Sequence, residues 1–154
     1  MFDVQKPIYL PVPHLRQKQD GDCLPICAYT VLAYLGRRVS LWRLRRVLKT
    51  NSMGTPFSNI SNLTRFGITV ETDIRGNFET LYNSLAANRP CIVSVETADF
   101  PHWDFNSLHA VVGIDQQYIY INDLEFPNAP ISVPYGEFDL AWLAQDERYA
   151  VLSL

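Results

Sequence analysis

The chain has 154 residues, of which 47% are hydrophobic and 19% are charged, and its formal net charge is −3. This length suits one domain that buries about two-thirds of its unfolded surface, and the composition excludes a disordered chain. The slightly acidic balance gives no reason to expect nucleic acid as a partner. The N-terminus is not a signal peptide, and no apolar run approaches the ~20 residues that span a bilayer. We therefore expect a single cytoplasmic domain over residues 1–154, with no membrane span.

Apolar periodicity and capping residues predict the elements in chain order. Residues 8–13 contain two prolines and are expected to be extended. Helices are predicted over 23–35, 41–48, 57–66, 78 to about 88 and 137–144. Strands are predicted over 68–72, 91–96, 108–114, 118–122, 131–133 and 149–154. Helices come first and strands later, which predicts an α+β fold with sequential antiparallel pairing rather than alternating βαβ units.

Several residues fix where these helices begin and end. Ser40 and Asn77 are predicted N-caps, and Gly36 and Gly67 follow the last residues of two helices. The segment 23–35 is hydrophobic nearly all round, which indicates a buried central helix.

Cys23 lies where the central helix is predicted to begin. The unpaired N–H groups of a first turn and the helix dipole stabilise a thiolate there, so its pKa should fall and the sulfur should become nucleophilic. Asp22 or Asp20 is a candidate cap, and Pro25 suits the first turn. The alternative is a half-buried structural cysteine. The cysteine count is odd and shows no disulfide spacing, so we expect free thiols, with Cys27 and Cys91 in the core.

A histidine and a carboxylate occur at hairpin spacing later in the chain. His109 opens an apolar strand, and Asp123 ends the next one. With a turn near residue 116, position 109 pairs with about position 123, and cross-strand neighbours lie ~4.5–5.5 Å apart at Cβ. A carboxylate on one imidazole nitrogen leaves the other to accept a proton from a thiol. A Cys-His-Asp arrangement is available if this part of the sheet packs against the start of the Cys23 helix.

Acyl transfer also requires hydrogen-bond donors for the developing oxyanion. The backbone N–H of Cys23 is one candidate. Gln17, six residues earlier, can offer its side-chain amide as the second, with Gln19 as the competing choice. The other interpretation of Gln17 is a solvated loop residue.

This ordered set resembles the papain-like cysteine peptidases, and most of all the C39 family of bacteriocin-processing peptidases with its free-standing relatives. The family has a Gln six residues before the cysteine of an Asp-Cys pair, a second cysteine four residues later and a valine-rich strand that begins with His. The matching residues here are Gln17, Asp22-Cys23, Cys27, His109-Ala110-Val111-Val112-Gly113 and Asn122-Asp123. The resemblance runs from about residue 12 to the C-terminus.

The resemblance implies a papain-like fold, with N-terminal helices packed on a twisted antiparallel sheet and an active-site cleft between them. By that matching, Cys23 is the nucleophile, His109 the base, Asp123 its orienting partner and Gln17 the oxyanion donor. Asp22 and Trp103 are candidates for contacts with a peptide or protein substrate, and Trp103 is otherwise a packing aromatic. Family members in export systems cut leader peptides after Gly-Gly, but this chain lacks the exporters' transmembrane and ATP-binding domains. It also has Leu24-Pro25 where the family usually has Gly after the cysteine.

Other functions are compatible with the same residues. The triad equally serves an amidase, a deamidase or an acyltransferase, and a papain-like fold can also be a peptide-binding module without turnover. A zinc site from Cys23, Cys27, His109 and Asp123 matches common zinc spacings poorly, so no metal or other cofactor is expected. The basic cluster Arg37, Arg38, Arg43, Arg45, Arg46 and Lys49 is either a solvated helix face or an anion-binding face.

Overall fold

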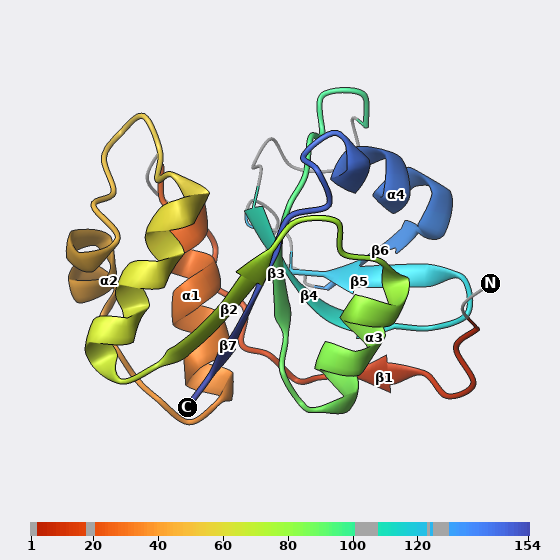
Figure 1. Cartoon of the computed structure of the whole chain (residues 1–154), viewed down its shortest axis with the longest axis horizontal. Coiled ribbons are helices and arrows are strands. Elements are labelled where there is room, and N and C mark those ends of the chain that lie inside the picture. The colour runs from red at the N-terminus through yellow and green to blue at the C-terminus, as the bar shows by residue number, and fades with distance from the viewer. Residues whose placement is uncertain (1–2, 18–20, 101–107, 123, 125–129) are drawn as a thin grey trace.

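The computed structural model describes residues 3–17, 21–100, 108–122, 124 and 130–154. Within them, two groups of helices cover opposite faces of an antiparallel sheet (Figure 1). One group comprises α1 (Cys23–Tyr34), α2 (Leu41–Val47) and the 3-10 helix η1 (Phe57–Phe66). The other comprises α3 (Phe78–Ala86) and α4 (Tyr135–Leu143). The predicted α+β class is confirmed.

The described strands form one sheet in which neighbours run antiparallel. They are β1 (Ile8–Tyr9), β2 (Thr69–Asp73), β3 (Cys91–Ser94), β4 (Leu108–Ile114), β5 (Tyr118–Ile121), β6 (Ile131–Pro134) and β7 (Tyr149–Ser153). The strand order is β2-β7-β3-β4-β5-β6, and β1 pairs with the C-terminal end of β4. The C-terminal strand therefore lies between β2 and β3 rather than at an edge.

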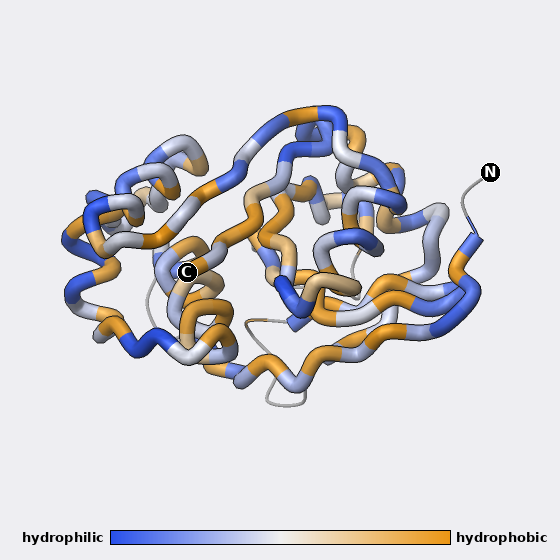
Figure 2. Tube along the Cα trace, turned by 60° about the horizontal axis from the view of Figure 1, so that its bottom comes forward, coloured by the Kyte–Doolittle hydropathy of each residue, from blue (hydrophilic) through white to orange (hydrophobic). Residues whose placement is uncertain are grey.

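The central strands β3, β4 and β7 separate two hydrophobic cores, because successive side chains of a strand point to opposite faces. Ile92, Ala110 and Ala150 belong to the core under α1, whereas Val93 and Val111 belong to the core under α3 and α4. Figure 2 shows the hydrophobic residues concentrated along these inner strands. None of the helices in the described ranges is long and apolar enough to cross a membrane.

Most predicted helix boundaries are confirmed. The Ser40 hydroxyl accepts a hydrogen bond from the Arg43 N–H at 3.3 Å, and Asn77 forms a capping box with Thr80. Gly36 and Gly67 have φ of 92° and 75°, the left-handed conformation that ends a helix. The segment 57–66 differs in kind, since it is a 3-10 helix whose buried residues Ile60 and Leu63 are three apart, as that geometry favours.

Candidate active site

Cys23 is the first residue of α1, as the sequence predicts. Its neighbours Asp22 and Leu24 are buried, whereas Cys23 itself is only half-buried. The first turn of α1 thus leaves the thiol partly accessible at the position where N–H groups and the helix dipole favour a thiolate.

Asp22 does not cap α1 with its side chain, which corrects one of the two capping expectations; Asp20 lies outside the described residues. Its carboxylate instead accepts hydrogen bonds from Arg45 of α2, from Nε at 3.0 Å and from Nη2 at 2.5 Å. A guanidinium offers charge-assisted, two-point contacts that a single backbone N–H cannot match. This bond raises the pKa of Arg45. The Asp22 side chain is 3% exposed and that of Arg45 30%, so the ion pair is largely shielded from water.

Gly21 fixes the turn before Cys23 from the other side. It has φ of 83°, and a Cβ at this position would lie 2.1 Å from the Asn51 carbonyl oxygen. The Thr55 hydroxyl donates to the Gly21 carbonyl at 3.3 Å. Only glycine fits here. The approach to Cys23 is therefore held by α2 and by the loop 50–56, an arrangement that the local sequence around Cys23 does not reveal.

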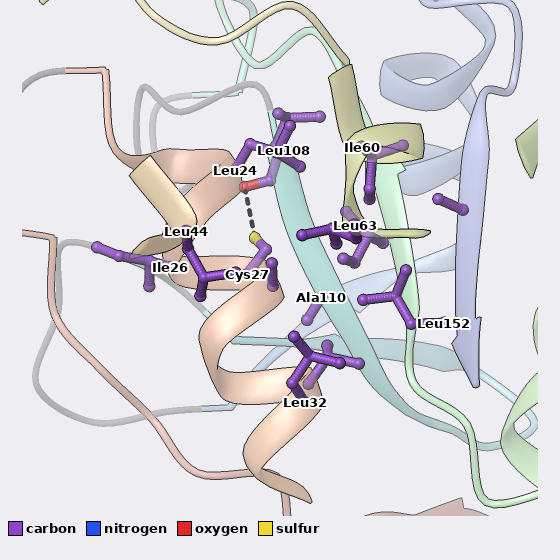
Figure 3. Close-up of a cluster of buried hydrophobic side chains, with 14 of the residues drawn as sticks. Leu24, Ile26, Cys27, Leu32, Leu44, Ile60, Leu63, Leu108, Ala110 and Leu152 are labelled. Atoms are coloured by element: carbon purple, nitrogen blue, oxygen red, sulfur yellow. Dashed lines mark hydrogen bonds between the residues drawn. The ribbon is translucent and has the colours of Figure 1, made fainter. Parts of the chain in front are cut away.

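α1 is joined to the beginning of β4. Cys27, one turn after Cys23, donates from Sγ to the Leu108 carbonyl oxygen at 3.6 Å (Figure 3). His109 is the next residue of β4, and it is fully buried, including its Nδ1 atom. Figure 1 shows α1 and β4 beginning at the same end of the molecule. The structure thus brings the predicted nucleophile and the predicted base to neighbouring element starts.

The faces of β4 restrict how these two residues can meet. Leu108 and Ala110 pack toward α1, whereas His109 pairs with Val93, whose side chain belongs to the opposite core. A contact between Cys23 and His109 must therefore be made around the end of β4, past Leu108, and not through the face that packs on α1.

The predicted hairpin is confirmed. Val111 lies opposite Ile121 and Gly113 opposite Tyr120, with a bulge between the two pairs. The Asn122 N–H donates to the Ala110 carbonyl at 3.1 Å, so the ladder continues toward His109. Asp123 lies outside the described residues, and its pairing with His109 stays a prediction.

Gln17 reaches the same region by another route. Its backbone N–H donates to the Leu124 carbonyl at 2.7 Å, and the side-chain oxygen Oε1 is buried. The segment before Cys23 and the segment after β5 are thus side by side. A solvated loop glutamine would not bury its amide oxygen. Gln19 and Trp103 lie outside the described residues.

The other two cysteines are core residues, as expected. Cys27 and Cys91 are buried, and burial raises the pKa of the Cys91 thiol, so that thiol stays protonated. The three cysteines all lie in the described part of the chain, and no disulfide joins them. Among the described residues, no group of three or more His, Cys, Asp or Glu side chains is placed to hold a metal ion.

Comparison with known proteins decides the family. The model of the Peptidase C39 family matches residues 11–145. This chain belongs to the Peptidase C39 family. A search of curated proteins gives no match. The fold is papain-like, as expected from the sequence.

Solved C39 structures share the fold across nearly the whole chain. A putative C39-like peptidase from Bacillus anthracis has a TM-score of 0.80 at 15% identity, covering 97% of this chain and 98% of that one. A double glycine motif protease from an AMS/PCAT transporter, in complex with the leader peptide, has a TM-score of 0.73 at 21% identity, with coverage of 95% and 96%. The peptidase domain of Streptococcus ComA, a bi-functional ABC transporter, also has a TM-score of 0.73 at 21% identity, covering 90% of this chain and 96% of that one.

The structure also accommodates the point at which this C39 chain departs from its family. Leu24, which replaces the usual glycine after the cysteine, is fully inaccessible to solvent and belongs to the core under α1. Pro25 is buried as well. The larger side chain is therefore accommodated in the core.

Proposed function

We propose that this chain is a cysteine peptidase that hydrolyses peptide bonds through an acyl-enzyme on Cys23. The observation that carries the proposal is the half-exposed Cys23 at the start of α1, in a C39 chain whose α1 is joined to β4 one residue before His109. A core cysteine would be fully buried, as Cys27 and Cys91 are.

In this proposal His109 takes the proton from the Cys23 thiol, and the thiolate attacks the carbonyl carbon of the substrate. His109 then returns the proton to the leaving amine as the peptide C–N bond breaks. A water molecule then gives one proton to His109 and its hydroxide to the acyl carbon. The C–S bond breaks, and His109 returns that proton to the departing sulfur, which restores the thiol. Asp123 holds the imidazole orientation through the second ring nitrogen.

The oxyanion donors in this proposal are the Cys23 backbone N–H and the Gln17 side-chain amide. At the start of a helix the backbone N–H groups and the helix dipole favour a developing negative charge. The burial of Gln17 Oε1 supports the assignment, because a buried amide has less freedom to turn than a solvated one.

We propose polypeptides with small residues before the scissile bond, such as Gly-Gly, as substrates. Support comes from the double glycine motif protease, which shares this fold and was solved in complex with the leader peptide.

The test measures alkylation of each cysteine by iodoacetamide from pH 5 to 9, followed by peptide mass analysis. Cys23 should react at least tenfold faster than Cys27 or Cys91 near neutral pH, and His109→Ala should slow the reaction. Cys91→Ala, which removes a buried thiol from the other core, is the matched control and should leave the Cys23 profile unchanged. Equal rates for all three thiols, with no effect of His109→Ala, would overturn the proposal.

Cleavage of Gly-Gly peptides, compared with Leu-Leu peptides and with Cys23→Ala as the blank, tests the substrate class.

A further inference from the structure

Charge is divided unevenly along this chain. Residues 23–70 contain no Asp or Glu, although the whole chain has 16, while seven of its 13 Lys and Arg residues lie there. One of the seven, Arg45, is paired with Asp22. The remaining six are exposed and form what we call the basic surface. It consists of Arg37, Arg38, Arg43, Arg46, Lys49 and Arg65.

Three guanidinium groups of the basic surface contact aromatic or backbone groups instead of carboxylates. Arg37 donates from Nη2 to the Phe66 carbonyl at 2.7 Å, and the Arg43 guanidinium lies 4.9 Å from the centre of the Phe66 ring. Arg46 lies over the Trp42 ring at 5.5 Å. Within the described residues, no member of the basic surface forms a salt bridge. Two cations thus converge on Phe66 without a described counter-charge.

An exposed tryptophan lies against one of these cations, Arg46. Trp42 is 63% exposed on α2, whereas the apolar face of that helix, Leu44 and Leu48, is fully inaccessible to solvent. Trp and Arg are the residue types that contribute most to protein–protein binding. Arg also binds carboxylates through two parallel hydrogen bonds, which a Lys cannot do. Five of the six cations of the basic surface are Arg.

We propose that the basic surface binds an acidic segment of a partner polypeptide, rich in Asp and Glu, with Trp42 as the apolar anchor. The held guanidiniums present fixed donors to side-chain carboxylates, which reduces the entropy lost on binding. A membrane is a poorer fit, because an interfacial helix needs an apolar face and that of α2 is used in the core. Nucleic acid is a poorer fit too, because the rest of this chain is acidic and would repel an extended phosphate backbone.

The test is a fluorescence anisotropy titration of a labelled glutamate-rich peptide of about 15 residues at 0.15 M salt. The same peptide with Gln in place of Glu is the ligand control. Arg43→Ala/Arg46→Ala should weaken binding about tenfold, and Trp42→Ala should weaken it severalfold. Lys6→Ala/Arg75→Asn removes the same net charge elsewhere and should change the affinity less than twofold. Circular dichroism checks that each variant folds.

Each alternative gives a result that would overturn the proposal. Equal weakening by the two double variants would show a general charge effect. Tighter binding to phosphatidylserine vesicles or to a DNA duplex would assign the surface to another partner. Salt-sensitive self-association in sedimentation, abolished by Arg43→Ala/Arg46→Ala, would assign it to a second copy of this chain. None of these measurements depends on the chemistry of Cys23.

Discussion

Asp22 and Cys23 are adjacent residues in very different surroundings. The Asp22 carboxylate is almost fully buried against Arg45, whereas the next side chain is half-exposed at the start of α1. A carboxylate removed from water is costly unless it is paired, so the Arg45 guanidinium stabilises this turn. The ion pair therefore acts on the position of Cys23 through the backbone and need not touch a substrate.

Arg45→Met should destabilise the protein by about 3 kcal/mol, because it leaves the Asp22 carboxylate buried without a counter-charge. Urea unfolding followed by circular dichroism measures the loss. The double variant Asp22→Asn/Arg45→Met removes the uncompensated charge and should recover at least half of it. A loss below 1 kcal/mol, or no recovery, would mean that water already solvates this carboxylate.

Gln17→Ala should lower turnover of a cleaved Gly-Gly peptide by roughly 10²–10³, with little change in KM, if the amide stabilises the oxyanion only in the transition state. The backbone hydrogen bond from Gln17 to Leu124 does not involve the side chain, so folding should survive the change. Gln116→Ala, on the exposed turn between β4 and β5, is the matched control. An unchanged rate would move the role to Gln19 or to another donor.

At the scale of elements, the turn between β4 and β5 is organised by one carboxylate. Asp115 accepts hydrogen bonds from the Tyr120 hydroxyl at 2.6 Å, from the Tyr118 N–H at 2.7 Å and from the Gln117 N–H at 2.8 Å. Burial acts to raise the pKa of Asp115, but these hydrogen bonds stabilise the charged form, and the net pKa is lowered. The hydrogen bond from the Tyr120 hydroxyl to Asp115 raises the pKa of Tyr120.

Asp115→Asn should make stability less sensitive to acid. Because the folded pKa of Asp115 lies below its unfolded value of about 3.9, the contribution of the charged carboxylate is complete above that value and disappears as pH falls through the folded pKa. The free energy of unfolding of the parent should exceed that of the variant by about 1–2 kcal/mol at pH 7, and this difference should shrink toward pH 3. Urea midpoints at several pH values measure it. Asp139→Asn removes an exposed carboxyl group from α4 and is the matched control. A difference between the parent and Asp115→Asn that stays constant with pH would contradict this prediction.

Local signals explain which elements the sequence could predict. Ser40 and Asn77 satisfy N–H groups three residues away, so their capping is encoded within a few positions. The start of α1 at Cys23 is local in the same sense. The expectation that Asp22 caps α1 was wrong because its partner, Arg45, lies on another helix. Sequence spacing does not predict a pair of this kind. The packing of Cys27 on Leu108 is likewise long-range, so sequence could supply the candidate residues but not their approach.

At the scale of the molecule, two cores share the same inner strands. Before the bulge in β4, changes at odd and even positions therefore act on different halves of the protein, with Val111 in one core and Ala110 in the other. His109 belongs to the face turned away from α1, which the apolar run 108–114 could not reveal, since a strand buried on both sides has no alternation to read. The basic surface lies on the half that contains α1, α2 and η1, so the two halves also differ in charge.

The placement of β7 between β2 and β3 has a consequence for the order in which the protein is made. β7 pairs along its length with β2 and over residues 149–151 with β3. Among the described strands, β2 therefore lacks its partner, and β3 has only β4, until residues 149–153 have been synthesised. Cys23 and His109 both precede β7 in the chain. During translation they exist for a time without the completed sheet that separates the two cores. The sheet that carries β4 is therefore completed only by late, long-range pairings, which are slow to form because a long loop must close before the strands can pair.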